Sequence, residues 1–175
     1  GDDFFAGCTA LKSVFIPLSL QNVSSPFRKC TALTDVTFED GRTELPDTLL
    51  EGSGVRQLTV PQTVTKIGYS AFAGCTQLTA ITLPDGLRKL GNEAFKGCTA
   101  LTGVALPDSL TALGYGVFRG CSALTAAEFP AGITPASWRS GSDMLRNCTS
   151  LRSVKLPKTV SSLGDDFFAG CTALE

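Results

Sequence analysis

The residues Ile67–Pro84, I-G-Y-S-A-F-A-G-C-T-Q-L-T-A-I-T-L-P, decide the fold of this chain. The next stretch, Leu90–Pro107, repeats them almost unchanged as L-G-N-E-A-F-K-G-C-T-A-L-T-G-V-A-L-P. A segment that recurs at a fixed step is one structural unit, and it buries its apolar face only by stacking on copies of itself. The sequence therefore predicts a solenoid in which residues 1–175 form a single repeat array.

The cysteines mark the step of the repeat. Successive gaps between them are 22, 45, 23, 23, 27 and 23 residues, and the 45-residue gap spans two repeats. Aligning Leu58 on Ile81 places Gly52 opposite Cys75 in the skipped slot. The chain then holds about seven repeats of 22–27 residues, each with one strand of the pattern L-x-x-I-x-L. The predicted strands are Leu11–Ile16, Leu33–Phe38, Val55–Val60, Leu78–Leu83, Leu101–Leu106, Leu124–Phe129 and Leu151–Leu156.

Alternating apolar and polar residues in each strand indicate one buried face. Ile81 and Leu83 are expected to point inward, and Ala80 and Thr82 outward. The A-F-x-G-C piece before each strand is shorter than an ordinary helix of about 11–12 residues, so we expect a 3₁₀ or single-turn helix there. Corners of positive φ are expected at the glycines that follow the second apolar pair. These are Gly68, Gly91, Gly114 and Gly164.

Three places depart from the repeat. Two coils are predicted to be one residue short, because Val23–Phe27 and Leu45–Leu49 align with the longer Ile67–Phe72. The third departure is a four-residue insertion within Ala131–Ser142. Residues 1–11 also recur identically as residues 164–174, and neither end carries a polar capping unit. We therefore expect the chain to be a fragment of a longer array.

Composition argues against several classes of protein. The net charge of −1 provides no basic field for a phosphate backbone, so nucleic acid is not an expected partner. The sequence has nothing near the roughly 18 consecutive apolar residues that a membrane span needs. Histidine, the commonest general base and metal ligand, is absent from the sequence. We expect a protein that is not an enzyme and that has no cofactor and no metal.

The cysteine row allows three interpretations. Stacked coils place equivalent Cα atoms about 4.8 Å apart, which is within the range of a disulfide. The side chains would nevertheless point the same way, and the count of seven is odd. A spacing of 22 residues is also far from that of a zinc site. We favour buried free thiols that act as small hydrophobes, with some disulfide or a metal site as the alternatives.

Candidate binding residues come from the outward face of the strands and from the insertion. The outward positions are mostly small and polar, which is typical either of a ligand face or of a sheet that must curve tightly. Trp138, in the insertion, is either a recognition residue or a packing plug over the edge of the coil. The candidates are Phe15, Asp35, Gln57, Glu128 and Lys155 on the face, and Trp138 and Arg139 in the insertion.

The pattern A-F-x-G-C-T-x-L-T-x-I-x-L-P-x-x-L-x-x-L-G resembles the BspA-like, or Treponema pallidum type, leucine-rich repeat over nearly the whole chain. It departs from the commoner leucine-rich repeat because the Asn ladder after the strand is missing. The resemblance implies a right-handed, mainly β solenoid and a secreted or cell-surface protein of the kind regarded as an adhesin. It carries no catalytic motif.

Two functions remain open from the sequence. The first is a non-enzymatic adhesion or protein-interaction module that is extracellular or at the cell surface and binds a protein or glycan, possibly of a host. The second is a structural spacer that displays neighbouring repeats or domains of the same chain and has no ligand of its own.

Overall fold

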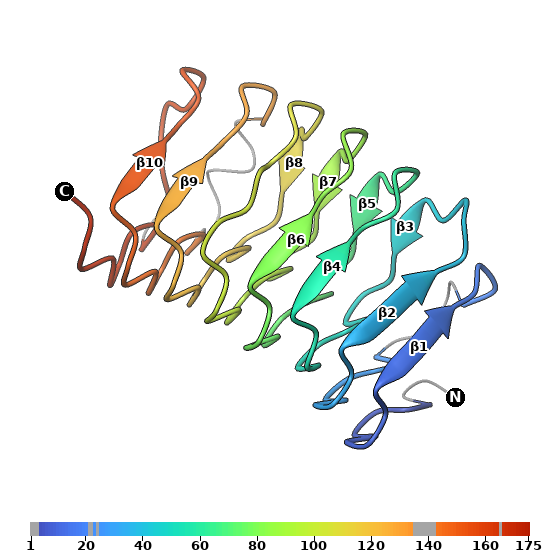
Figure 1. Ribbon diagram of the computed structural model, residues 1–175. Helices are drawn as coiled ribbons and strands as arrows, with labels where there is room; N and C mark the ends of the chain where they lie inside the picture. The colour runs from blue at the N-terminus through green and yellow to red at the C-terminus, as the bar shows by residue number, and fades with distance from the viewer. Residues whose placement is uncertain (1–3, 21–22, 24, 135–142, 165) are drawn as a thin grey trace.

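The computed structural model describes residues 4–20, 23, 25–134, 143–164 and 166–175. The chain is the predicted parallel solenoid, and its coils stack side by side in chain order from the N-terminus to the C-terminus (Figure 1). We number the coils 1 to 7 after the seven predicted strands. Six of these strands form, and they lie in one row along the molecule. They are β1 (Ser13–Ile16), β2 (Asp35–Phe38), β4 (Gln57–Thr59), β6 (Ala80–Thr82), β9 (Ala126–Glu128) and β10 (Ser153–Lys155).

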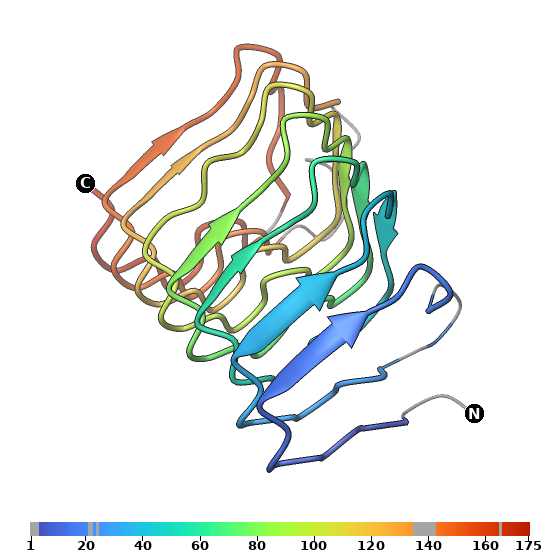
Figure 2. The same ribbon diagram turned by 45° about the vertical axis from the view of Figure 1, so that its right-hand side comes forward.

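The prediction of one strand per coil is incomplete, because a second row of two-residue strands lies on the return side of coils 2 to 5. These strands are β3 (Glu44–Leu45), β5 (Lys66–Ile67), β7 (Lys89–Leu90) and β8 (Ala112–Leu113). They form an unbroken four-stranded parallel sheet in the order β3-β5-β7-β8. The view along the stack in Figure 2 shows the two rows on different sides of each coil.

The first row, which we call the main sheet, is interrupted. It consists of the three separate pairs β1-β2, β4-β6 and β9-β10. The predicted strand Leu101–Leu106 of coil 5 does not form, and this prediction is wrong. Its outward residues are Gly103 and Ala105, both poor strand formers, and Gly103 is the only glycine at the first outward position in the seven repeats.

A ladder of hydrogen bonds at the G-C corner holds all the coils together. We call the position that cysteine occupies in most repeats the Cys slot. The amide of the residue before this slot donates a hydrogen bond to a carbonyl oxygen of the next coil. All seven N···O distances are 2.7 Å. The seven donors all have positive φ. They are Gly7, Lys29, Gly52, Gly74, Gly97, Gly120 and Asn147. The predicted 3₁₀ or single-turn helices are wrong, because the described residues of these corners form turns only.

The prediction of positive φ at the glycines after the second apolar pair is wrong for Gly68, Gly91 and Gly114. Gly68, Gly91 and Gly114 are not in the left-handed region. A Cβ atom on Gly91 would lie 2.5 Å from the carbonyl carbon of Gly68, and one on Gly114 would lie 2.3 Å from the amide nitrogen of Asn92. Glycine is therefore required at these positions because successive coils approach closely there.

Leu, Ile, Val, Phe and Cys side chains fill the interior, as the alternation predicts. Leu78, Leu87 and Leu90 are fully buried, and Ala80 and Thr82 are exposed. Phenylalanine rings stack from coil to coil, with centroid distances of 5.3 Å between Phe72 and Phe95 and 5.7 Å between Phe95 and Phe118. Because one coil contributes only one ring, this stack forms only between coils.

The structure corrects the alignment of coil 3. The corner ladder places Gly52 opposite Gly74, so Ser53 and not Gly52 occupies the Cys slot beside Cys75. The Oγ of Ser53 lies 3.5 Å from the Sγ of Cys75. The position three residues before the Cys slot, which we call the Phe slot, is therefore filled by Leu50 and not by Leu49. The stretch from Leu45 to this slot is as long as Ile67–Phe72, so the prediction that it is one residue short is wrong. The missing residue lies after Ser53, at Gly54, where a Cβ would be 2.1 Å from the carbonyl oxygen of Thr31.

One charged side chain is buried in the core. The register of β3 and β5 places Arg42 in the slot that Val64 fills in the next coil, and Arg42 is only 3% exposed. Its guanidinium donates to the carbonyl oxygen of Leu20 at 3.1 Å and to that of Pro17. Its Nε has no hydrogen-bond partner. Burial lowers the pKa of Arg42, and the negative charge of Glu39 partly opposes this effect.

Candidate binding surface

The outward face of the main sheet carries the predicted candidate residues, and they do not form one cluster. Phe15, on β1, is 60% exposed. Its register partner on β2 is Thr37, and Asp35 lies on the same strand two residues earlier. Glu128 and Lys155 lie on β9 and β10 at the other end of the face and form an ion pair. Trp138 and Arg139 lie outside the described residues, so their roles stay predictions.

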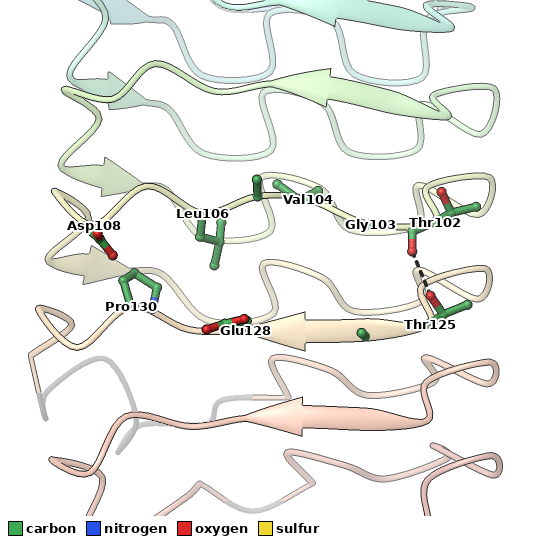
Figure 3. A pocket seen from close by; sticks show the side chains of 10 residues that line it. Thr102, Gly103, Val104, Leu106, Asp108, Thr125, Glu128 and Pro130 are labelled. Atoms are coloured by element: carbon green, nitrogen blue, oxygen red, sulfur yellow. Dashed lines mark hydrogen bonds between the residues drawn. The ribbon is translucent and has the colours of Figure 1, made fainter.

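Two grooves lie on this face, each where the main sheet is interrupted. The first, which we call the coil-5/6 groove, has a volume of about 380 Å³. Its lining side chains come from the irregular strand segment of coil 5 and from β9 (Figure 3). The lining residues are Thr102–Leu106, Asp108, Thr125, Ala126, Glu128 and Pro130.

Main-chain groups without internal partners lie along the coil-5 side of this groove. Among the described residues, no backbone hydrogen bond involves the amides or carbonyls of Gly103, Val104, Ala105 or Leu106. On the other side, β9 pairs with β10 only, so its edge toward coil 5 is unpaired. Backbone polar groups need hydrogen-bond partners, and here solvent or a ligand must supply them.

The groove is bounded where the coils come together again. The amide of Thr125 donates to the carbonyl oxygen of Thr102 at 3.2 Å, and the Thr125 hydroxyl donates to the same oxygen at 3.3 Å (Figure 3). Beyond the other end, the amide of Thr134 donates to the carbonyl oxygen of Thr111 at 3.0 Å. The two coils are thus linked on both sides of the groove, which keeps its shape fixed.

The charge of the coil-5/6 groove is negative. Asp108 and Glu128 line it, and no Lys or Arg is among its lining residues. Glu128 pairs with Lys155, but both side chains are about 70% exposed, and such an ion pair contributes little. Asp108 has no ion pair with any described residue.

The second groove, the coil-2/3 groove, lies between β2 and β4 and has a volume of about 410 Å³. Gln57, a predicted candidate, lines it together with Thr37, Asp40 and Thr59. Phe15 lies next to this groove, because its register partner Thr37 belongs to the lining. Both flanking segments are regular strands here, unlike in the coil-5/6 groove.

The cysteines form a structural row and offer no reactive site in the interior. All seven are free thiols, as predicted, but only five are buried, since Cys8 is exposed and Cys171 is half-buried in the terminal coils. Six of them lie 3.0–3.2 Å from the Phe-slot carbonyl oxygen of the preceding coil, to which each S–H donates. Burial raises the pKa of Cys75 to about 11 and that of Cys148 to about 12. A thiol with such a pKa is a poor nucleophile at neutral pH.

Within the described part of the chain, no three His, Cys, Asp or Glu side chains come together in a way that would hold a metal ion. Across the same residues, no helix is long and apolar enough to cross a membrane.

Comparison with known proteins identifies the family. The model of the BspA type leucine rich repeat region, in six copies, matches residues 1–123 and 43–175 and so covers the whole chain. The chain belongs to the BspA-type leucine-rich repeat family. A search of curated proteins found no match to this BspA-type chain.

Solved structures share the solenoid of this BspA-type chain. The leucine-rich repeat protein of T. pallidum superposes with a TM-score of 0.67 at 25% identity, over 94% of this chain and 84% of that one. A leucine-rich cell surface protein of Faecalibacterium prausnitzii gives 0.52 at 23%, over 99% and 61%. The pneumococcal vaccine antigen PcpA gives 0.63 at 19%, over 94% and 49%. The last two likenesses are of fold alone.

Sequence reasoning missed the grooves. It treated Gly103 and Ala105 as two more small outward residues of a regular strand, and it did not select Asp108 or Thr125. One signal was available, since a glycine inside a strand pattern often marks a place where a ligand or another backbone approaches. For the coil-2/3 groove no comparable signal exists, because Asp35–Phe38 and Gln57–Thr59 both read as normal strands.

Proposed function

We propose that this chain is a non-enzymatic protein-interaction module, extracellular or at the cell surface, that binds partners through the outward face of its main sheet. The observation that carries the proposal is the pair of grooves at the interruptions of that sheet. A surface that presents unpaired main-chain groups and small side chains leaves room for another chain to approach closely.

Several features support an interaction role over catalysis. Five of the seven thiols are buried, and the sequence contains no histidine to act as a general base. Family membership supports the location at the surface, and the F. prausnitzii protein of the same fold is described as a cell surface protein. Adhesion to a host protein or glycan is the finer form of this proposal.

The test is a binding screen with the whole chain immobilised. Extracellular matrix proteins and glycans are passed over it, with Phe15→Ala and Trp138→Ala variants in parallel. We expect at least one matrix protein to bind, and its binding to weaken in a variant that alters the outward face or the insertion. A screen without any binding would contradict the proposal and would favour the spacer function.

A further inference from the structure

We propose that the coil-5/6 groove binds an extended, basic segment of a partner protein, with its main chain along Gly103–Leu106 and a Lys or Arg side chain at Asp108 and Glu128. This inference rests on the proposed interaction function and specifies its site and the chemistry of its partner. A neutral glycan is the alternative occupant, and its binding is one outcome of the experiment.

The unpaired main chain is the first argument for an extended peptide. Gly103–Leu106 presents four residues without any internal backbone hydrogen bond, a length of about 13 Å in extended form. The free amides and carbonyls of four consecutive residues can pair with the main chain of another extended segment. A sugar ring lacks this periodic arrangement of donors and acceptors.

Open space above the segment is the second argument. A Cβ atom built on Gly103 would meet no atom within 4 Å, and Gly103 does not have positive φ. Ala105 and Ala126 are exposed and carry only a methyl group. A partner main chain therefore meets no large side chain at Gly103, Ala105 or Ala126, and Val104 and Leu106 supply the apolar part of the lining (Figure 3).

Charge selects a basic partner. The lining contains two carboxylates and no cation. Asp108 is exposed and has no ion pair with a described residue, and the exposed pair of Glu128 with Lys155 is weak enough to exchange for a partner's cation. An acidic segment would instead be repelled by Asp108, which has no cation paired with it among the described residues. The coil-2/3 groove has one carboxylate, Asp40, and regular strands on both sides, so it is the weaker candidate.

The experiment uses three probes with the whole ¹⁵N-labelled chain. They are a blocked hexapeptide of alternating Thr and Lys, the same peptide with Glu in place of Lys, and a neutral hexasaccharide. We expect the Lys peptide alone to shift the amide resonances of residues 102–106, 108 and 125–129. Because the contact is partly electrostatic, its affinity should fall as salt is raised from 50 to 500 mM.

Matched variants separate the groove from the rest of the face. Gly103→Leu fills the groove without backbone strain and should remove binding, whereas Ala80→Leu adds the same side chain at the equivalent position of coil 4 and should leave it unchanged. Asp108→Asn should weaken binding by about 1.5- to fivefold, the range for an exposed ion pair. Asp85→Asn, the equivalent change one coil earlier, should have no effect.

Three results would overturn the inference. They are equal binding of the Glu peptide, binding of the hexasaccharide in the groove in place of the peptide, and no resonance shift with the Lys peptide at millimolar concentration. If a matrix protein binds the chain equally well after Gly103→Leu, the groove assignment fails and the proposed interaction function stands. If neither the screen nor the peptide gives binding, both fail.

Discussion

The thiol of Cys98 donates a hydrogen bond to the carbonyl oxygen of Phe72 in the preceding coil, with a distance of 3.2 Å from Sγ to oxygen. The same oxygen also accepts the amide of Cys75 at 3.1 Å. Cysteine in this slot therefore fills space and also links one coil to the next. Ser53, which takes the slot in coil 3, is the other small side chain that can donate from the same position.

Substitutions at Cys98 separate the two roles. If the donor matters, Cys98→Ser should be less destabilising than Cys98→Ala by about 0.5–1 kcal/mol, the net contribution of one hydrogen bond. If the thiol were only a small hydrophobe, the serine hydroxyl would be the worse replacement because it buries a polar group. Urea denaturation of the two variants measures the difference, and a more stable alanine variant would contradict the donor role.

The buried thiols predict a loss of stability at alkaline pH. Burial raises the pKa of Cys75 to about 11 and that of Cys148 to about 12, whereas an unfolded cysteine ionises near 9.0. Because the thiol pKa is higher in the folded chain than in the unfolded chain, each buried neutral thiol contributes its full stabilisation well below pH 9. This contribution is lost as the pH rises through 9 toward the folded pKa. By pH 10, each such thiol should have removed about 1.4 kcal/mol from the free energy of unfolding, about 1 kcal/mol of it between pH 9 and 10.

Denaturation at pH 8, 8.5, 9 and 10 under reducing conditions tests this dependence. The free energy of unfolding should change little from pH 8 to 8.5 and should then fall. Cys75→Ser removes one of the titrating groups and should fall less steeply. A flat profile up to pH 10 would show that these thiols are accessible to solvent in the folded chain.

The phenylalanine stack predicts a large effect of truncating its central ring. Phe95 is fully buried and stacks on Phe72 and Phe118. Phe95→Ala should lower the free energy of unfolding by about 3–5 kcal/mol, because it opens a cavity between two other coils. Phe95→Leu is the control, since Leu50 fills the same slot in coil 3 and the change should be smaller. A loss below about 1 kcal/mol for alanine would contradict the packing.

The buried arginine predicts a stabilising substitution. Arg42 lies in a core slot that valine fills in the next coil, and its Nε lacks a partner. Replacing a buried charge with an apolar residue of similar volume is often neutral or stabilising by about 1–4 kcal/mol. Arg42→Leu should therefore raise the midpoint of thermal unfolding or leave it unchanged.

Arg42→Ala is the matched comparison for that substitution. It also removes the charge, but it leaves a cavity and should destabilise the chain. If Arg42→Leu proved as destabilising as Arg42→Ala, the bonds from the guanidinium to the carbonyls of Pro17 and Leu20 would be essential for the first coils.

Much of this fold is predictable because each repeat specifies the same burial pattern. Period-two alternation correctly placed Ala80 and Thr82 outward and Leu83 inward. The errors share one physical cause, which is that contacts between coils decide local conformation. The backbone of Gly68 meets that of Gly91, so glycine there reflects close approach and not φ. No single repeat contains that information.

The candidate site was less predictable than the fold. The outward positions of Phe15, Glu128 and Lys155 followed from alternation, and the structure places them on that face. The grooves depend on which neighbouring strands pair, a property of two coils at once. Trp138 lies outside the described residues, so its role in recognition stays a prediction.

The corner ladder also sets how the molecule deforms under load. Its seven bonds of 2.7 Å run without interruption from the corner at Gly7 to the corner at Ala169, whereas the main sheet is broken into three pairs. One sense of bending spreads the coils on the main-sheet side and keeps them closed at the corners, and it breaks few hydrogen bonds. Bending in the opposite sense must stretch the hydrogen bonds of the corner ladder. The solenoid is accordingly stiff in one direction and compliant in the other, with its hinge axis along the glycine–cysteine corners.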